Sequence, residues 1–460
     1  MAKQMMLNAF EMMVPAFQSP GLWRHPDDQS YRYVELDYWI ELARTLESGG
    51  FSGIFLADIL GQYDVYGGNG DATMRGGVQY PVLDPTVIIP ALAAGTSRIG
   101  VGVTASVTYE HPYLLARRFT TLDHLTNGRV GWNIVTSYQN SAARNLGLTE
   151  QPPHDERYDR ADEYMEVVYK LWESSFEDDA VVADRETGLF IDPTKVHSIN
   201  HVGKHFSVPG PALAAPSVQR TPLLFQAGAS PRGLSFAAEH AEAIFFNGPT
   251  PAIVRKWVDT IRGSLIEKGR SADAVKIFTM ATVIVAETDE AAKAKYEDFQ
   301  RYVDPEAALA LWGGWTGVDL SGVDVDEPLK YVDSEAHQSA LATFTKLDPE
   351  RVWTIREMAK FISIGGRGPV IVGSPQTVAD ELERWIAEAD VDGFNLSSVI
   401  RPSGEEDFVR LVSPELRRRG VLAEPSEGQT FREAVLGKGP RIADDHRGAQ
   451  YRPAATNAVE

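Results

Sequence analysis

Short apolar runs that alternate with amphipathic helical stretches are the feature of this sequence that most restricts its fold. Because a crossover helix must return the chain to the same end of the sheet, this alternation predicts parallel strands covered by helices on both faces. Eight strands are predicted in the 460 residues, at Met5–Phe10, Gly53–Ala57, Ile99–Thr104, Val130–Val135, Leu223–Gln226, Ala243–Phe246, Ile277–Ala286 and Gly393–Leu396.

Eight strand–helix units favour a closed (β/α)8 TIM barrel of the α/β class. A doubly wound open sheet is the alternative, but the Gly-x-Gly-x-x-Gly turn expected after its first strand is missing. Two regions interrupt the alternation, and we expect them to be lids or subunit contacts. We predict one barrel domain over residues 1–437, with insertions at about 176–217 and 303–369, and a tail at 438–460. The polar chain beyond Pro414 is expected to wrap the surface or a neighbouring subunit.

The composition excludes several classes of function. Without cysteine the chain has no thiolate metal site, cysteine nucleophile or redox dithiol, so redox chemistry requires a bound cofactor. The formal net charge of −20 repels the phosphates of nucleic acids and of anionic lipids. No apolar run reaches the roughly 18 residues of a membrane helix, and the first residues lack the features of a signal peptide. We therefore expect a cytoplasmic protein that binds neither nucleic acid nor membrane.

Polar side chains stand at the predicted ends of the strands, where TIM barrels place their working residues. They include one histidine and one clear carboxylate, but no cluster of carboxylates. This set suits the binding of a large polar cofactor better than the hydrolysis of a bond. Its members are His25, Asp58, Thr104, Asn133, Thr136, Ser137, Gln226 and Asn247.

Residues 229–233, Ala-Ser-Pro-Arg-Gly, are the best phosphate-binding candidate, because they open a helix whose first backbone N–H groups lack partners. Arg232 adds a positive charge. The alternative is that Ser230 is an N-cap beside an incidental arginine. His154 and Tyr158 are four residues apart at a helix start, so they can face the same way and bind a phosphate or a ring edge. The alternative for His154 is an ordinary loop histidine.

Other candidates also keep more than one interpretation. His25 is either a group that moves a proton or a structural loop histidine. Asp58 is a general base, an N-cap or an acceptor that orients a ligand. His197, His201 and His205 look like a metal-binding string, but no acidic ligand lies in helical register with them, so we predict no metal.

Several long motifs in the same order give this sequence a specific resemblance. His111–Ser137, with the sequence HPYLLARRFTTLDHLTNGRVGWNIVTS, resembles the bacterial luciferase-like flavin monooxygenases. The segments WRHPDD, ERYDRADEYMEVVYKLW, DPTKVHSINHVGKHFSVPGP and QAGASPRGLSFAAEHAEAIF resemble a narrower group. That group contains nitrilotriacetate monooxygenase component A, dibenzothiophene-sulfone monooxygenase and dimethyl-sulfide monooxygenase. The resemblance extends to about Gly437.

The resemblance implies a TIM barrel with insertions and the activity of the large, oxygenase component of a two-component monooxygenase. In this scheme a separate NAD(P)H:FMN reductase supplies reduced FMN, and the oxygenase uses O2 through a C4a-(hydro)peroxyflavin. His25 is the catalytic residue implied, and family members carry a non-proline cis peptide beside the position of Thr104. The flavin contacts carried over by motif are Asp58, Thr104, Asn133, Ser137, His154, Tyr158 and Ser230, with the phosphate at 229–232 beside Arg232.

The substrate is predicted to be small and apolar, because aromatic side chains occupy the predicted loops. An organosulfur compound is favoured, and oxidative dehalogenation of a chlorinated aromatic is the alternative. The other classes considered are a deazaflavin-dependent reductase, a barrel hydrolase and a non-catalytic flavin-binding protein. We expect a homodimer or homotetramer, and a lid formed by Val303–Pro369. The predicted pocket residues are Phe10, Trp23, Tyr63, Phe246 and Trp312.

Overall fold

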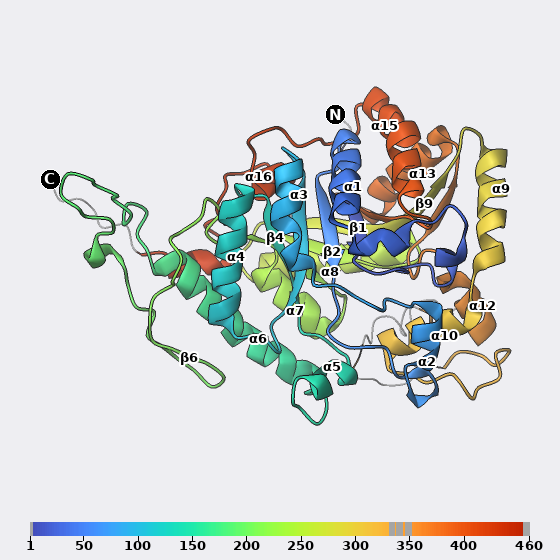
Figure 1. Cartoon of the computed structure of the whole chain (residues 1–460), viewed down its shortest axis with the longest axis horizontal. Helices are drawn as coiled ribbons and strands as arrows, with labels where there is room; N and C mark the ends of the chain where they lie inside the picture. Colours follow the sequence, from blue (N-terminus) through green and yellow to red (C-terminus); the bar gives the residue numbers. More distant parts are fainter. Residues whose placement is uncertain (1–2, 331–335, 337–343, 346–351, 454–460) are drawn as a thin grey trace.

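The computed structural model describes residues 3–330, 336, 344–345 and 352–453. Eight parallel strands form a closed barrel in the order β1, β2, β3, β4, β7, β8, β9, β11, with β11 paired to β1 and β9 paired to β8 (Figure 1). The predicted (β/α)8 TIM barrel is confirmed. Its strands are β1 Met6–Met12, β2 Gly53–Ala57, β3 Gly100–Ser106, β4 Val130–Val135, β7 Leu223–Ala227, β8 Ala243–Phe246, β9 Lys276–Val285 and β11 Gly393–Ser397.

Helices connect the strands and cover the outside of the barrel (Figure 1). Helix α13 is typical: Ser374 caps its first turn, a proline follows, and Val378, Leu382 and Trp385 are buried at helical spacing. The helices are α1 Leu36–Ser48, α2 Asp71–Gly76, α3 Ile89–Gly95, α4 Pro112–Thr126, α5 Asn140–Asn145, α6 His154–Tyr169, α7 Pro231–His240, α8 Pro251–Glu267, α9 Asp289–Phe299, α10 Pro305–Thr316, α12 Ile355–Ile362, α13 Pro375–Ala389, α14 Ser403–Asp407, α15 Ser413–Arg419 and α16 Phe431–Leu436. No helix among these described residues is long and apolar enough to cross a bilayer.

Aromatic side chains fill the inside of the barrel. The ring of Phe10 meets those of Phe55 and Phe245 edge to face, with centroids 5.7 and 4.9 Å away. The ring of Phe225 lies 5.5 Å from Phe55, and a Cβ at Gly131 would lie only 2.9 Å from it. These rings make a packed floor, so space for a ligand begins toward the C-terminal ends of the strands.

The N-terminal mouth of the barrel is closed by α16. Thr430 and Glu433 form a capping box at its start, and the ring of Phe431 enters the barrel beside β2 and β3. A Cβ would lie 2.6 Å from this ring at Gly53 and 2.3 Å from it at Gly100, so glycine is required at both positions.

Arg432 fixes the same helix by a buried ion pair. Its side chain is fully buried and donates to both carboxylate oxygens of Glu242, at 2.8 and 2.7 Å. It also donates to the carbonyl oxygens of Thr221, Pro222 and Pro440. The expectation that the chain beyond Pro414 wraps the surface or a neighbouring subunit does not hold for this segment, because Phe431 and Arg432 are buried at the barrel mouth.

Two insertions leave the barrel where the alternation of strands and helices is interrupted. Residues 176–217 follow α6 and its π-helical extension Lys170–Ser174, and extend away from the barrel as an arm (Figure 1, green) that contains the short strands β5 His201–Val202 and β6 Ser207–Val208. Residues 303–369 contain α10 and α12, whereas positions 331–335, 337–343 and 346–351 of this predicted lid lie outside the described residues.

Strand β10, Val370–Gly373, follows the second insertion and was not predicted from the sequence. It pairs with the second half of β9 outside the barrel circle. The predicted tail packs on the barrel through Ile442 and His446, which are 2% and 1% exposed. Residues 454–460 of that tail lie outside the described part of the chain.

Candidate cofactor and substrate site

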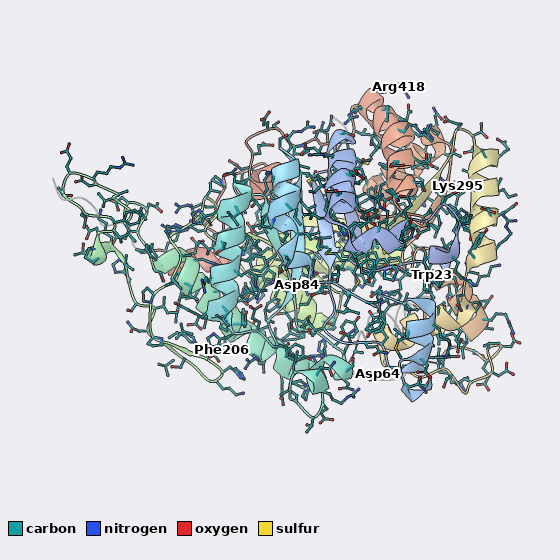
Figure 2. The ribbon with its side chains drawn as sticks, in the orientation of Figure 1. Trp23, Asp64, Asp84, Phe206, Lys295 and Arg418 are labelled. Atoms are coloured by element: carbon teal, nitrogen blue, oxygen red, sulfur yellow. The ribbon has the colours of Figure 1, made fainter. Side chains whose placement is uncertain are left out.

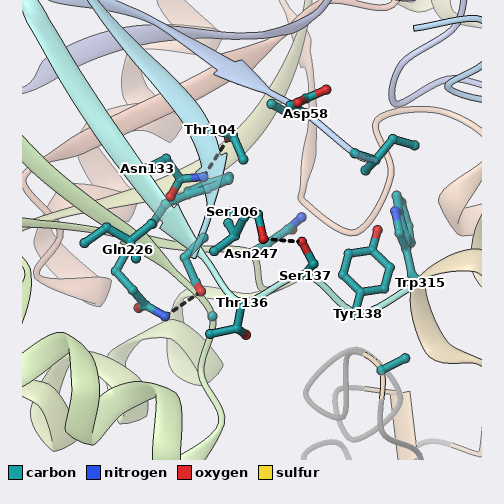
Figure 3. A pocket seen from close by; sticks show the side chains of 18 of the residues that line it. Asp58, Thr104, Ser106, Asn133, Thr136, Ser137, Tyr138, Gln226, Asn247 and Trp315 are labelled. Atoms are coloured by element: carbon teal, nitrogen blue, oxygen red, sulfur yellow. Dashed lines mark hydrogen bonds between the residues drawn. The ribbon is translucent and has the colours of Figure 1, made fainter. Parts of the chain in front are cut away.

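A cavity opens at the C-terminal ends of the barrel strands, above the aromatic floor (Figure 3). It encloses about 240 Å³, far more than the roughly 10–15 Å³ that one buried water needs. The structure brings most of the predicted site residues together around it. Those that line it are Asp58, Thr104, Asn133, Ser137, His154, Tyr158 and Ser230, together with Phe10, Tyr63 and Phe246 from the predicted substrate pocket.

Three amide side chains at neighbouring strand ends leave buried acceptors without partners. They are Asn133 of β4, Gln226 of β7 and Asn247 directly after β8, and the side-chain oxygen of each has no hydrogen-bond partner among the described residues. The Asn133 amide nitrogen donates to Thr104 Oγ1 at 2.9 Å, which orients its oxygen (Figure 3). Buried acceptors of this kind are costly unless a ligand donates to them.

One end of the cavity has the features of an anion site. Ser230 caps α7 by accepting from Gly233 N at 3.1 Å, and His154 Nε2 lies 3.4 Å from Ser230 Oγ. Arg157 lines the cavity and donates to the carbonyl oxygen of Ser137 at 2.8 Å. A helix N-terminus, a histidine and an arginine together favour a phosphate.

Arg232, predicted to contact the phosphate, does not line the cavity. Its guanidinium lies 2.6 Å from Asp162 and 3.2 Å from Asp159, and stacks over the ring of Tyr158 at 5.3 Å. The two carboxylates one turn apart on α6 hold it away from the opening. Arg157 is the cation that the cavity receives instead, and the sequence analysis missed it.

Asp58 is the carboxylate of this cavity. Burial, and then the charge of Asp84, raise the pKa of Asp58 to about 7, although the backbone N–H of Ile59 opposes the rise. Near neutral pH the Asp58 side chain can therefore either accept a hydrogen bond as a carboxylate or donate one as an acid.

A chain of hydroxyl groups lies on the side of the cavity that faces the second insertion. Tyr63 donates to Gln79 Oε1 at 2.9 Å, so the hydroxyl of Tyr138, also 2.9 Å away, donates to Tyr63. Burial raises the pKa of Tyr138 to about 12 and that of Tyr63 well above its ordinary value, so both remain protonated. Gln79 and Tyr138 were not predicted, because nothing in their local sequence marks them as neighbours of Tyr63.

Two predicted pocket residues lie elsewhere. Trp23 is 43% exposed and its indole donates to the Gly76 carbonyl oxygen at 3.0 Å (Figure 2). Trp312 is fully buried against Phe344, because it lies on the face of α10 that packs on α12. Trp315 of the same helix lines the cavity, so the aromatic contribution of α10 was predicted with the wrong tryptophan.

His25 does not line the cavity either. Its Nε2 lies 2.9 Å from Asp298 Oδ2, and its Nδ1 accepts from the backbone N–H of Asp27 at 3.2 Å. The rings of Phe299 and Tyr302 enclose it at centroid distances of 5.4 and 4.8 Å. With both ring nitrogens engaged, the geometry favours the structural interpretation of His25.

The expected non-proline cis peptide beside Thr104 is absent, and this prediction was wrong. The cis bonds of the described chain precede Pro81 and Pro402. Strand β3 continues in regular register with β4 through Ser106, so the backbone at Thr104 is ordinary extended strand. Within the same described residues, no cluster of three or more histidine or acidic side chains could hold a metal ion.

A parallel barrel with a polar cavity at the C-terminal ends of its strands, beside a helix N-terminus, has the usual arrangement of a ligand-binding TIM barrel. Comparison with known proteins identifies the family. The sequence matches the luciferase-like monooxygenases over residues 13–393, and the chain belongs to that family.

Relatives with similar sequence or structure cover nearly the whole chain. Dimethyl-sulfide monooxygenase of Hyphomicrobium sulfonivorans is 49% identical over 99% of this chain and 95% of its own length. The crystal structure of DmoA from the same organism superposes with a TM-score of 0.92, covering 99% of this chain and 97% of that one at 49% identity. A structure of riboflavin lyase with modified FMN and riboflavin, 38% identical, gives a TM-score of 0.92 and covers 98% and 100% of the two chains.

Proposed function

We propose that this monooxygenase is the oxygenase component of a two-component system that uses reduced FMN. The observation that carries the proposal is the set of unpaired amide oxygens on Asn133, Gln226 and Asn247, beside the anion site at the start of α7. The edge of a flavin ring carries N–H donors for such acceptors, and its phosphate suits Ser230, His154 and Arg157. The donor set therefore fits FMN.

Reduced FMN, supplied by a separate NAD(P)H:FMN reductase, provides the two electrons that activate O2 in this proposal. One oxygen atom enters the substrate and the other leaves as water. The hydroxyls of Tyr63 and Tyr138 hold protons at the cavity wall, and Asp58 accepts or donates one near neutral pH. Trp315 and Ala336 of the second insertion line the cavity and limit the access of water.

The test is an anaerobic titration with reduced FMN. Replacing Asn133 or Gln226 by Leu should weaken binding at least about tenfold, since each loses one buried hydrogen bond to the ring. Arg157→Met should weaken it similarly through the phosphate. Arg232→Met is the matched control, and its affinity should stay within about threefold of the wild type, because Asp159 and Asp162 already hold that guanidinium. Unchanged affinity in the three variants of Asn133, Gln226 and Arg157 would contradict the proposal.

We further propose a small organosulfur substrate, with a chlorinated aromatic as the alternative. Phe10, Phe17, Phe55, Phe245 and Phe246 give the cavity an apolar wall, and the relative with 49% identity is named for dimethyl sulfide. Product analysis by mass spectrometry with a panel of sulfides and chloroaromatics, with 18O2 as the oxidant, distinguishes the two. Label in neither kind of product would contradict a monooxygenase of this substrate range.

We also propose that the protein assembles as a homodimer or homotetramer through the arm at residues 176–217. Large apolar side chains are exposed along it, including Phe190 at 68% and Val202 at 83%. A monomeric soluble protein rarely exposes such a series on one projecting segment. Sedimentation equilibrium of the wild type and of Phe190→Asp measures the assembly, and a wild-type monomer at micromolar concentration would exclude it.

A further inference from the structure

Arg367 is a cation of the cavity wall. It lies in the Gly-Gly-Arg-Gly-Pro segment between α12 and β10, and its guanidinium makes no hydrogen bond or ion pair with any described residue. Its Nε is buried. The ring of Trp315 lies 5.1 Å from its Cζ, and Tyr63 and Tyr138 interact with its charge.

Arg367 is half-buried, and its situation differs from that of the buried arginines in the described chain. Each of those donates hydrogen bonds to carbonyl or carboxylate oxygens, as a buried guanidinium ordinarily must. They are Arg129, Arg157, Arg220, Arg270, Arg401 and Arg432. Arg367 presents its donors to the cavity instead.

The segment that carries Arg367 is fixed in place. Gly365 and Gly366 have φ values of 78° and 64°, which few other residues adopt. The N–H of Gly365 donates to Ser19 Oγ at 3.1 Å, and a Cβ at Gly366 would lie 2.0 Å from Gln18 Oε1. The position of the Arg367 backbone is therefore determined by packing and not by the ligand.

The guanidinium keeps its charge in this setting. Burial lowers the pKa of Arg367 only to about 10, with the neighbouring Tyr138 and Tyr63 opposing the decrease. Both tyrosines are neutral near pH 7, because burial raises the pKa of each. A positive charge thus faces the cavity from the segment between α12 and β10. This segment is far in sequence from the anion site at the starts of α6 and α7.

We propose that Arg367 is a specificity-determining residue that binds an anionic oxygen group, a carboxylate or a sulfonate, on the substrate. This inference rests on the proposed function and narrows the substrate to one with an oxidisable apolar part and an anionic end. A charge-assisted, two-pronged contact is the strong form of arginine recognition, and the ring of Trp315 lies 5.1 Å from Cζ of this fork. The phosphate of FMN is the competing anion, and its candidate ligands Ser230 and His154 begin other helices, α7 and α6.

The experiment compares matched probes in the protein loaded with reduced FMN. The probes are (methylthio)acetate, 2-(methylthio)ethanesulfonate and the neutral (methylthio)acetamide, with Kd measured anaerobically by calorimetry and KM by oxygenated product. The variants are Arg367→Met, Arg367→Lys and the control Arg356→Met, which removes an exposed arginine of α12 that pairs with Asp326. Thermal midpoints and the affinity for reduced FMN are measured on the same preparations.

We expect the wild type and Arg356→Met to bind at least one anionic probe about 10-fold or more tightly than the amide. Arg367→Met should abolish that preference, with the affinities for the amide and for reduced FMN unchanged within about threefold, and Arg367→Lys should retain part of it. The carboxylate and sulfonate arms identify which anion is preferred.

The proposal is overturned if the wild type shows no anionic preference. It is also overturned if Arg367→Met weakens all three probes equally, or if it weakens reduced FMN in parallel, which would assign the residue to the cofactor. If Arg367→Met does not fold, Arg367→Lys decides, because a purely structural arginine would leave the probe preference intact. Loss of the preference without oxygenated product from any probe contradicts the proposed monooxygenase reaction and leaves the anion site standing.

Discussion

The two mouths of the barrel are built from the same strands but differ in how their polar groups are paired. At the N-terminal mouth, Arg432 and Glu242 are buried and paired, and Phe431 fills the space between two glycines. At the C-terminal mouth, amide oxygens on Asn133 and Gln226 and the guanidinium of Arg367 face the cavity without a hydrogen-bond partner in the part of the chain that the structure describes.

This difference assigns stability to the N-terminal mouth and ligand binding to the C-terminal mouth of the same barrel. Groups paired at one mouth hold the chain together, and groups left unpaired at the other keep their hydrogen-bonding capacity for a ligand. The charges follow the same division. Burial raises the pKa of a carboxyl group because it disfavours the charged form. Arg432 nevertheless holds the pKa of Glu242 below its ordinary value. At Asp58 no cation among the described residues offsets burial, and the pKa rises to about 7.

The largest effect is expected at the closed mouth. Arg432→Met should lower the free energy of unfolding by about 3–5 kcal/mol, because it leaves the Glu242 carboxylate buried without a partner. Urea denaturation measures the loss, and Arg418→Met, which removes a largely exposed arginine, is the control. The double variant Arg432→Met, Glu242→Met should recover part of the stability. A loss below about 1 kcal/mol would show that the closed mouth is not a stabilising plug.

A smaller effect of opposite sign is expected at the open mouth. The pKa of Asp58 is higher in the folded chain than its ordinary value of 3.8, so the carboxylate destabilises the fold increasingly as pH rises through that interval. Asp58→Asn should therefore stabilise the protein at pH 8 by up to about 4 kcal/mol, with the gain disappearing toward pH 4. Unfolding curves from pH 4 to 8 test this, with the exposed Asp27→Asn as control. A gain that does not depend on pH would exclude the assigned pKa.

The smallest effect is expected at His25, which follows β1 but does not line the cavity. His25→Ala should lower stability by about 1–3 kcal/mol through the lost contact with Asp298, while oxygenated product per bound reduced flavin stays constant. Measurement of the thermal midpoint, FMN affinity and H2O2 release on one preparation separates the interpretations. A fall in product with a rise in H2O2, at unchanged FMN affinity, would restore the catalytic interpretation that the resemblance implies.

The sequence predicted the open mouth better than the closed one. Each barrel strand carries its own local pattern, and residues such as Asp58, Thr104 and Asn133 end these strands, so their convergence follows from the fold. Phe431 and Arg432 carry no such signal, because a six-residue helix in a polar segment has the same appearance on a surface as inside a barrel.

Some cavity residues could not be predicted for the same reason, because their local sequence does not show that they face the cavity. Arg157, Gln79 and Arg367 reach the cavity from three connections far apart in the chain, and only the packed structure decides which arginine faces inward. The local sequence favoured Arg232 as the cation of the phosphate site. In the structure Arg232 pairs with Asp159 and Asp162, and Arg157 lines the cavity instead.

Gly53 and Gly100 are synthesised long before the aromatic ring that packs against them. Their strands leave the ribosome early, but the ring that fills the gap beside them belongs to residue 431, which follows after roughly 15–75 s at ~5–20 residues per second. Until then the ring that occupies the space beside these two glycines in the folded chain has not been synthesised. A chain that ends before Phe431 lacks this ring. A residue translated late therefore completes the packing of strands that are translated early.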